Sequence, residues 1–457
     1  MEFPMKQSIA SILLLAIIPV AVLVAGTTGK IAGRITDKSN AEPLPGVNIV
    51  VATTTLGASS AADGSYTILN VPPGLYTIRV SLIGYAAITV THVRVVVDQT
   101  TTLHHSLEPS TVDLADIVVR AERPAIQRDL TATVSVLSSE QIKLLPVKDF
   151  VEVLQLQAGV VGEGSRINVR GGRSNEVAYL IDGMYVKDPV LGTLGTRINN
   201  DAIAELNFLS GTFNAEYGNA LSGVVNIITK EGSKEFSGLL EGRTSEFGVT
   251  RYSNIRESRV SGSLSGPLGA EDLSFFLSGE RDARGSWLPF GHDKTISSFV
   301  KINSRLSSEF KLALSGRYTE NRRQPYNHSW KYIPEQYIRI REYSRQATAT
   351  VTHSAAQNLF YDLRFSFFNQ SYYSGVDKDT SKYITAANRE YLPVGTGYEF
   401  YSHADPLEII DNRTSTLNFK GDLVWQIGKA NEVKFGVELK KHKLNYFNIY
   451  DPKRNFP

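Results

Sequence analysis

The second half of the chain alternates apolar and polar residues with a period of two. Leu314 and Tyr318 share one face of such a run, while Ser315 and Arg317 share the other. Because successive side chains of a strand point to opposite faces, the pattern predicts long strands with one apolar and one polar face. The same alternation recurs at 361–367, 417–425 and 435–440.

Turns and loops between these runs differ sharply in length. Residues 266–269 (GPLG) form a short turn, whereas 321–342 and 371–411 are long and polar. Aromatic residues also become more frequent after residue 232. Apolar faces toward lipid, polar faces toward a wet lumen and unequal loops are typical of a transmembrane β-barrel, which we predict for 233–457. A soluble sandwich is the alternative, but it would need facing sheets that nothing in the sequence marks.

Residues 27–109 predict a small β-domain. Turn signals recur about every ten residues: Asp63-Gly64 precedes a strand, Pro72-Pro73-Gly74 follows it, and Gly84-Tyr85 closes the next turn. Asp-Gly between alternating runs is a strong hairpin signal. Short strands at this spacing predict a β-sandwich.

Residues 126–232 mix helix and strand signals. The run 150–156 (FVEVLQL) predicts a helix, and 138–141 gives a weaker helix start. A strand ending at Val169 is followed by two glycines and then by 179–186, which predicts a two-residue hairpin around Asp182-Gly183. This unit is therefore expected to be α/β, between two units made mainly of strands.

The N-terminus predicts export. Lys6 precedes a nearly unbroken apolar run from Ile9 to Val24, and small residues follow it, so we interpret 1–26 as a secretory signal peptide. A permanent helical anchor is the alternative, although the run is somewhat short for a span. With no cysteine after the run, a lipid-anchored lipoprotein is excluded.

Composition excludes several functions. Lys and Arg total 48 against 46 for Asp and Glu, a balance that argues against a nucleic-acid partner. With no cysteine there are no disulfides or thiolate metal sites. His105 and Glu108 have the spacing of a zinc ligand pair, but no third ligand motif is present, so we read them as a strand end. We expect no cofactor, no metal and no enzyme activity.

A short strand-prone segment lies between the first two units. Residues 110–125 form a linker in which Pro109 and Pro124 bracket the segment 116–121 (DIVVRA). Proline lacks a backbone donor and fixes its own φ, so the segment is expected to lie outside both folded units. The alternative is an ordinary edge strand of a flanking domain.

Two resemblances give these units a family. The segment 27–109 resembles the carboxypeptidase regulatory-like domain. The matching residues are Gly33, Asp37, Pro43-Leu44, Asp63-Gly64-Ser65-Tyr66, Pro73-Gly74-Leu75-Tyr76 and Gly84-Tyr85. The segment 126–232 resembles the plug domain of TonB-dependent outer-membrane receptors. Its matching residues are Arg170-Gly171-Gly172-Arg173, Asp182-Gly183, Tyr217-Gly218, Gly223 and Asn226, in the order and spacing of that family.

The resemblance assigns a role to the linker segment. It lies where the family places its TonB box, the contact point for the energising protein, just before the plug. The candidate box residues are Asp116, Ile117, Val118, Val119, Arg120 and Ala121. The implied fold class is mainly β: an N-terminal β-sandwich, an α/β plug domain and the first part of a large antiparallel transmembrane β-barrel.

The resemblance also implies a function. We expect TonB-dependent active import of a nutrient, such as a siderophore, cobalamin, a glycan or a peptide, across the cell outer membrane. The implied partners are a TonB-type inner-membrane energy complex, a small nutrient ligand and outer-membrane lipid, with a surface lipoprotein left open. The alternative is an outer-membrane signalling or surface-adhesion receptor without transport.

Site residues follow from the same resemblance. In the family, plug arginines pair with barrel carboxylates, so Arg170 is the first candidate and Arg173 the second. The alternative is that both are solvated loop residues. The tip at Asp182-Gly183 and the loop after Val186 are candidates for the apex that faces the ligand.

The strand count leads to one more expectation. About nine or ten strands are predicted after residue 232, whereas barrels that hold a plug have about 22 strands. We therefore expect the parent protein to be several hundred residues longer than 457.

Overall fold

The computed structural model describes most of the chain after the N-terminal segment. The described residues are 27–110, 117–120, 133–147, 149–163, 166–211, 217–218, 220–245, 256–269, 272–286, 291–376, 390–393, 399–403, 408–428 and 431–450. The segment interpreted as a signal peptide lies outside them, as do Asp116 and Ala121 of the candidate box. No helix in the described part of the chain combines the length and apolar character needed to span a bilayer.

The N-terminal domain is a β-sandwich, as predicted. One sheet contains β4 (Ser65–Val71), β1 (Gly29–Asp37), β7 (Thr100–Thr102) and β8 (His105–Leu107). The other has the order β3 (Gly57–Ser59), β2 (Asn48–Val51), β5 (Gly74–Ser81), β6 (Ile88–Val95) and β9 (Ile117–Arg120). Ile31 and Ile35 of the first sheet pack against Ile49, Ile78 and Val90 of the second, and all five are fully buried. Alternating apolar residues therefore close a core between two sheets, as the turn spacing indicated.

The second unit is an α/β domain built on a five-stranded sheet. Its order is β10 (Thr133–Ser138), β15 (Ile203–Ser210), β16 (Gly223–Thr229), β13 (Val177–Ile181) and β14 (Met184–Tyr185). A separate hairpin joins β11 (Val160–Glu163) to β12 (Arg166–Val169). The helices are α2 (Ser139–Leu144) and α3 (Phe150–Gln155), with short 3-10 turns η1 (Ser174–Glu176) and η2 (Asn200–Ala202).

Local chemistry explains the helices and the hairpin of this unit. Ser138 caps α2 in a capping box with Gln141, and the side chain of Asp149 accepts from Val151 and Glu152 at the start of α3. Both predicted helices are therefore confirmed. Between β13 and β14, Asp182 and Gly183 have φ of +49° and +73°, the left-handed pair that a tight two-residue hairpin requires.

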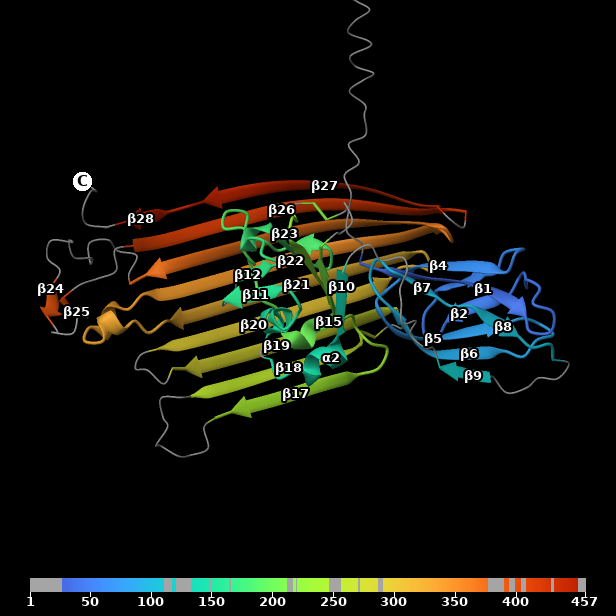
Figure 1. The fold of residues 1–457 in the computed structure, drawn as a ribbon, viewed down its shortest axis with the longest axis horizontal. Helices are drawn as coiled ribbons and strands as arrows, with labels where there is room; N and C mark the ends of the chain where they lie inside the picture. Colours follow the sequence, from blue (N-terminus) through green and yellow to red (C-terminus); the bar gives the residue numbers. More distant parts are fainter. Residues whose placement is uncertain are drawn as a thin grey trace, which may run out of the picture.

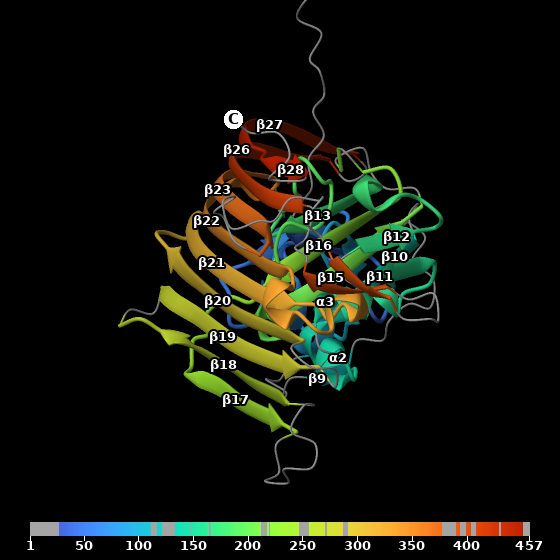
Figure 2. The same cartoon turned by 90° about the vertical axis from the view of Figure 1, so that its left-hand side faces the viewer.

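The third unit is a curved antiparallel sheet of long strands. Its order is β17 (Ser237–Thr244), β18 (Glu257–Pro267), β19 (Leu273–Gly285), β20 (His292–Arg305), β21 (Phe310–Gln324), β22 (Arg339–Ala356), β23 (Leu359–Gly375), β26 (Glu408–Ile427) and β27 (Asn431–Asn445), with β28 (Asn448–Tyr450) also on β26. The long connections carry the turns η4 (His328–Trp330) and η5 (Pro334–Gln336) and the hairpin β24 (Glu390–Pro393) to β25 (Glu399–His403). We call this sheet the wall, because it curves around one side of the α/β unit (Figure 2).

The wall is polar toward the α/β unit and apolar on its outer surface. In β23, Leu363 and Phe365 are 42% and 51% exposed, whereas Arg364 and Ser366 between and beside them are buried. The same inversion is found in β26, where Leu417 and Phe419 are exposed and Asn418 and Lys420 are buried. The predicted alternation is confirmed, and its sense is that of a transmembrane barrel.

The two ends of the wall differ. Short connections follow β18, β20, β22 and β26, and longer ones follow β17, β21 and β23. Figure 1 shows the N-terminal domain beside the short-turn end, with the α/β unit inside the curve of the wall. Transmembrane barrels have short periplasmic turns and longer outer loops. The N-terminal domain therefore lies at the end that corresponds to the periplasmic side.

Prediction. Phe365→Arg should destabilise the folded wall, because it places a charge in the middle of the outward face of β23. The cost in free energy of unfolding should be about 2–4 kcal/mol in lipid. Leu359→Arg is the matched control, since it lies on the same face at the short-turn end of β23, where the expected cost is about 0–1 kcal/mol. Urea unfolding of the full-length protein in lipid vesicles measures both. Equal costs would contradict the assignment of the outward face to lipid.

Candidate functional site

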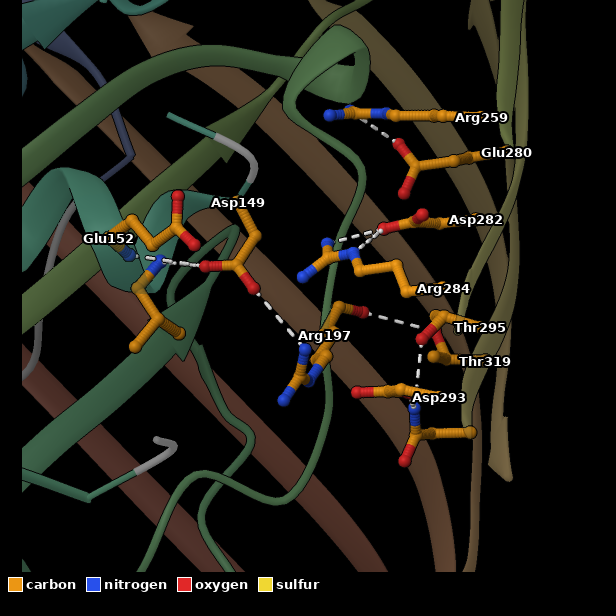
Figure 3. Close-up of polar contacts among 12 residues, drawn as sticks. Asp149, Glu152, Arg197, Arg259, Glu280, Asp282, Arg284, Asp293, Thr295 and Thr319 are labelled. Carbon is orange, nitrogen blue, oxygen red and sulfur yellow. Dashed lines mark hydrogen bonds and ion pairs between the residues drawn. The ribbon is translucent and has the colours of Figure 1, made fainter. Parts of the chain in front are cut away.

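The candidate site is the interface between the α/β unit and the polar face of the wall. Figure 3 shows its charged part on β18 and β19, where Arg259 pairs with Glu280 at 2.7 Å and Arg284 pairs with Asp282. On the facing side, Arg197 reaches Asp149 of the α3 cap at 3.2 Å. These ion pairs each lie within the wall or within the α/β unit. The two units can therefore separate here without leaving these charges unpaired.

The hairpin tip of the α/β unit binds the wall directly. The carboxylate of Asp182 accepts from the backbone N–H of Thr229 at 2.9 Å and from its hydroxyl at 2.6 Å. Lys301 of β20 lies 3.3 Å from the same carboxylate and 3.1 Å from the Thr229 hydroxyl. Lys420 of β26 donates to the carbonyl of Gly183 at 3.0 Å. Two wall lysines on separate strands therefore hold one two-residue turn.

A second ion pair lies where the chain leaves the α/β unit for the wall. Lys311 of β21 donates to both carboxylate oxygens of Glu231, at 2.8 and 2.7 Å, and Lys301 lies 3.9 Å away. Burial works against the charge of Glu231, but the ammonium groups of Lys311 and Lys301 lower its pKa to about 2. Glu231 therefore stays ionised, and the strand β16 is fixed to the wall at its end.

These contacts correct one prediction. We expected Asp182-Gly183 to form the ligand-facing apex, but Lys301 is four residues from the short-turn end of β20, so the tip points toward that end. The reason is topological: β13 runs parallel to β16, and β16 leads to the first strand of the wall. The apex prediction for Asp182-Gly183 is wrong.

The loop after Val186 lies toward the opposite end. Its Thr196 bonds Ser344 of β22, Asp188 bonds Gln370 of β23, and the carbonyl of Arg197 accepts from Thr319 of β21 at 3.0 Å. A cavity of about 520 Å³ lies between this loop and the wall. Its lining includes Arg166, Arg173, Asn175, Leu191, Asn321, Arg323, Glu342, Tyr343, Tyr372 and Asn412. Its position and mixed lining make it the candidate ligand site, which the sequence predicted only through the loop.

The arginine pair of the glycine segment does not make the expected contact. Arg170 donates to the Thr133 hydroxyl at 3.0 Å, within the α/β unit, and its backbone has a φ of +48°. Arg173 lines the ligand cavity, and its backbone N–H donates to Glu176. No pairing of either arginine with a wall carboxylate is found among the described residues. The structure brings lysines of the wall to carboxylates of the α/β unit instead, which is the reverse polarity.

The remaining motif residues pack this unit. Gly171 has a φ of +79°, and a Cβ on Gly172 would lie 2.5 Å from the Ser222 side chain. Gly223 begins β16 against Val169, and Asn226 is fully buried in the same strand. Tyr217 is buried beside Ala178, Leu180 and Val224, and the Gly218 carbonyl accepts from Tyr185. These positions support the plug rather than contact the wall.

The candidate box is not free of the folded units. Ile117–Arg120 form β9, which pairs in parallel with β6 of the N-terminal sheet. Val118 is 68% exposed, while Val119 packs on the domain core. The expectation that the segment lies outside both units is wrong, because it forms an edge strand of the N-terminal sheet, and its role as the partner-binding box stays a prediction. Bracketing prolines prevent a long strand, but four residues are enough to extend an existing sheet.

The N-terminal domain also touches both of the other units. Asp98, in a turn after β6, accepts from the Tyr217 hydroxyl of the α/β unit at 2.8 Å and lies 3.5 Å from Lys434 of the wall. Lys30 of β1 pairs with Glu432 of the wall at 2.6 Å. At the short-turn end of the wall, a cavity of about 680 Å³ is lined by residues of the N-terminal domain, the α/β unit and the wall. The domain thus lies under the plug and next to the wall.

Sequence reasoning missed the residues that join the units. The sequence marks three of them, Lys301, Lys311 and Lys420, only as residues of the polar strand faces. It marks Glu231 and Asp98 only as loop residues. Each partner lies tens to hundreds of residues away in sequence, and one sequence carries no signal for such a pairing. The strand register, once known, places all three lysines on the inner face.

The comparisons with known proteins agree with this architecture. Residues 31–119 match the CarboxypepD_reg-like domain, and residues 126–224 match the TonB-dependent receptor plug domain. The chain is 24% identical over 222 residues to the TonB-dependent transporter Oar of Myxococcus xanthus, which covers 46% of this chain and 21% of Oar. It is 29% identical over 230 residues to the probable TonB-dependent siderophore receptor PirA of Acinetobacter baumannii, covering 45% and 28% of the two chains.

A solved structure shows the same fold. The ferripyoverdine receptor of the outer membrane of Pseudomonas aeruginosa, bound to ferripyoverdine, superimposes with a TM-score of 0.58 at 14% identity. The match covers 72% of this chain and 44% of that receptor. This chain therefore spans less than half of the solved receptor that it resembles.

The fold and the interface define a plug domain seated against the inner wall of a transmembrane β-barrel, with a β-sandwich at the short-turn end. Residues 31–119 are a carboxypeptidase regulatory-like domain and residues 126–224 a TonB-dependent receptor plug domain, and the chain is similar to TonB-dependent receptors.

Prediction. Lys301→Met should loosen the plug more than the double variant Lys301→Met, Asp182→Asn. The single change leaves a partly buried carboxylate without its cation, which typically costs about 3–5 kcal/mol, whereas the double change removes both charges. Hydrogen exchange at the Thr229 amide, which bonds Asp182, measures the loosening in the full-length receptor. Equal exchange in the single and double variants would show that the ion pair does not hold the tip.

Prediction. The Glu231 contact should be lost in acid. A carboxylate with a lowered pKa in the folded state stabilises that state above its unfolded pKa of 4.5, and the stabilisation is lost as pH falls toward 2. The melting temperature of the wild type should therefore fall more steeply between pH 4.5 and 2 than that of Glu231→Gln. Parallel curves for the two proteins would contradict the lowered pKa.

Proposed function

We propose that this receptor imports a small nutrient across the outer membrane, with energy supplied by a TonB-type complex of the inner membrane. The observation that carries the proposal is the set of polar contacts between the plug and the wall. Three wall lysines hold the Asp182-Gly183 turn and Glu231, where the chain leaves the plug for the wall. Phe276 and Phe299 of the wall pack with the plug core and resist opening by the hydrophobic effect, whereas the charged contacts can exchange with water when the plug moves.

The energy must arrive mechanically. No ATP is expected at an outer membrane. A pull on the segment before β10 would act on the first strand of the plug sheet. Strand pairing suits such a pull, because main-chain hydrogen bonds give grip with little sequence dependence.

Ligand capture is assigned to the cavity at the long-loop end. Arg166 and Arg173 line it from the plug, and Arg323 lines it from β21, paired with Glu342 at 2.9 Å. Tyr343 and Tyr372 add aromatic surface, and Asn321 and Asn412 add amides. Such a mixed lining suits a ligand that carries negative charge and polar groups around an organic frame.

Ferric siderophores are the first ligands to test. The similar PirA protein is named as a siderophore receptor, and the solved receptor with the same fold holds ferripyoverdine. Cobalamin, glycans and peptides follow, because the lining does not exclude them. Uptake of radioactive iron from a panel of ferric siderophores, and of labelled cobalamin, should fall when the gene is deleted and return when it is restored.

Prediction. Val118→Pro should abolish energised uptake of the ligand identified in this way and leave its surface binding unchanged. Proline removes a main-chain donor from β9, and the ligand cavity lies at the far end of the plug. Val118→Ala is the control, since it keeps every main-chain bond and should import at a rate within about twofold of the wild type.

Protease resistance of the N-terminal domain should be measured on the same variants. A proline variant that remains folded and imports at the wild-type rate would show that β9 is only an edge strand. Uptake by the wild type that survives an uncoupler of the inner-membrane gradient would overturn active import itself.

A further inference from the structure

Strand β9 belongs to two parts of the molecule at once. It is the segment that resembles a TonB box, and it is also the last strand of the five-stranded sheet of the regulatory-like domain. Its register is fixed by four parallel pairs, from Ile88 with Ile117 to Thr91 with Arg120. Val119 points to the domain core, so the segment is anchored by a side chain as well as by the ladder.

The outer edge of β9 is open to pairing. Among the described residues, β9 pairs only with β6, so its other side completes the sheet without a neighbour. In a strand, main-chain groups point alternately to the two sides, and those on the open side of an edge strand can accept a further strand. Val118 projects from the sheet face with 68% exposure, so its side chain does not cover this edge.

Resting on the function proposed above, we propose that the energising partner adds a β-strand to the outer edge of β9 while β9 stays paired with β6. The box is then one strand of a continuous sheet formed by the regulatory-like domain and the partner. The domain presents the box in an extended conformation with a defined register, instead of leaving it as a free segment that the partner must order.

Two features favour addition of a partner strand to β9 over removal of β9 from β6. Stripping β9 from β6 would break four ladder pairs and expose the half-buried Val119, whereas addition breaks nothing. A preformed strand also avoids the loss of conformational freedom that ordering a free segment would cost on binding.

In this arrangement the partner's force acts on the whole regulatory-like domain. Its Asp98 contacts Tyr217 of the plug and Lys434 of the wall, and its Lys30 contacts Glu432 of the wall. A pull on β9 would therefore strain the seat of the domain under the plug as well as the chain that leads to β10. Partner engagement and opening of the short-turn end are coupled through one rigid body.

A disulfide between β9 and β6 tests the proposal. Thr89 and Val118 are opposite each other in the ladder, and neighbouring strands are about 4.8 Å apart, within the range that a disulfide spans. The protein has no cysteine of its own, so Thr89→Cys, Val118→Cys gives a single defined pair. The bond would lie on the sheet face and leave the outer edge of β9 free.

The measurement is binding of the purified C-terminal domain of the host's TonB protein to the full-length receptor in detergent. Mass spectrometry confirms that the bond has formed. The oxidised and reduced forms should bind with Kd values within about twofold of each other. A Kd at least tenfold weaker on oxidation, restored by reductant, would overturn the proposal, because the partner would then need β9 stripped from the domain.

The matched control is Thr36→Cys, Ser106→Cys, a parallel pair between β1 and β8 of the same domain whose hydroxyls lie 2.9 Å apart. This control should bind the TonB domain with the wild-type Kd in both redox states. If oxidation weakens binding of the control as much as that of the β9 pair, the weakening is damage to the domain, and a weakening confined to the β9 pair is the result that overturns the proposal. Absence of binding by the wild type would overturn the function proposed above, and with it this inference.

Discussion

Every strand of the wall must present polar side chains inward and apolar side chains outward, and this constraint sets what the plug can be. Because this inner face is mostly polar, the plug meets it mainly through charges and hydrogen bonds, with Phe276 of β19 and Phe299 of β20 as the apolar exceptions that pack with the plug core. Arg364 of β23, which is almost completely buried, pairs with Asp362 and Asp422 of the wall, and its guanidinium also donates to the Thr27 hydroxyl at 2.9 Å. Three wall lysines, Lys301, Lys311 and Lys420, contact the plug.

The local features of the fold could be predicted from the sequence because each depends on neighbours in the chain. The period of two in β21, β23 and β26 fixed which side chains face the lumen. Asp182-Gly183 fixed the turn between β13 and β14, since both residues have positive φ. The cap at Asp149 started α3 where the apolar run begins. These elements needed no knowledge of what lies across the interface.

The site depends on pairs that are remote in sequence, and there prediction failed in instructive ways. Arg170 was expected at the wall because arginine suits carboxylates, yet its guanidinium donates to Thr133 within the α/β unit. Asp182 was placed at the wrong end because the direction of β13 depends on its parallel pairing with β16. The docking of β9 was underestimated because a four-residue strand has little preference of its own and gains its stability from β6.

The placement of charges gives the assembly a direction. At the short-turn end the plug is held by ion pairs that include Lys301 and Glu231, and a cavity lies beneath it. At the long-loop end the contacts of the plug loop are mostly neutral hydrogen bonds, as between Thr196 and Ser344, around a cavity whose lining includes Arg166, Arg173 and Arg323. Neutral contacts rearrange at lower cost when a ligand enters, whereas ion pairs in a partly buried site need a force to separate them. The long-loop end of the interface is therefore adaptable, and the short-turn end is held more firmly.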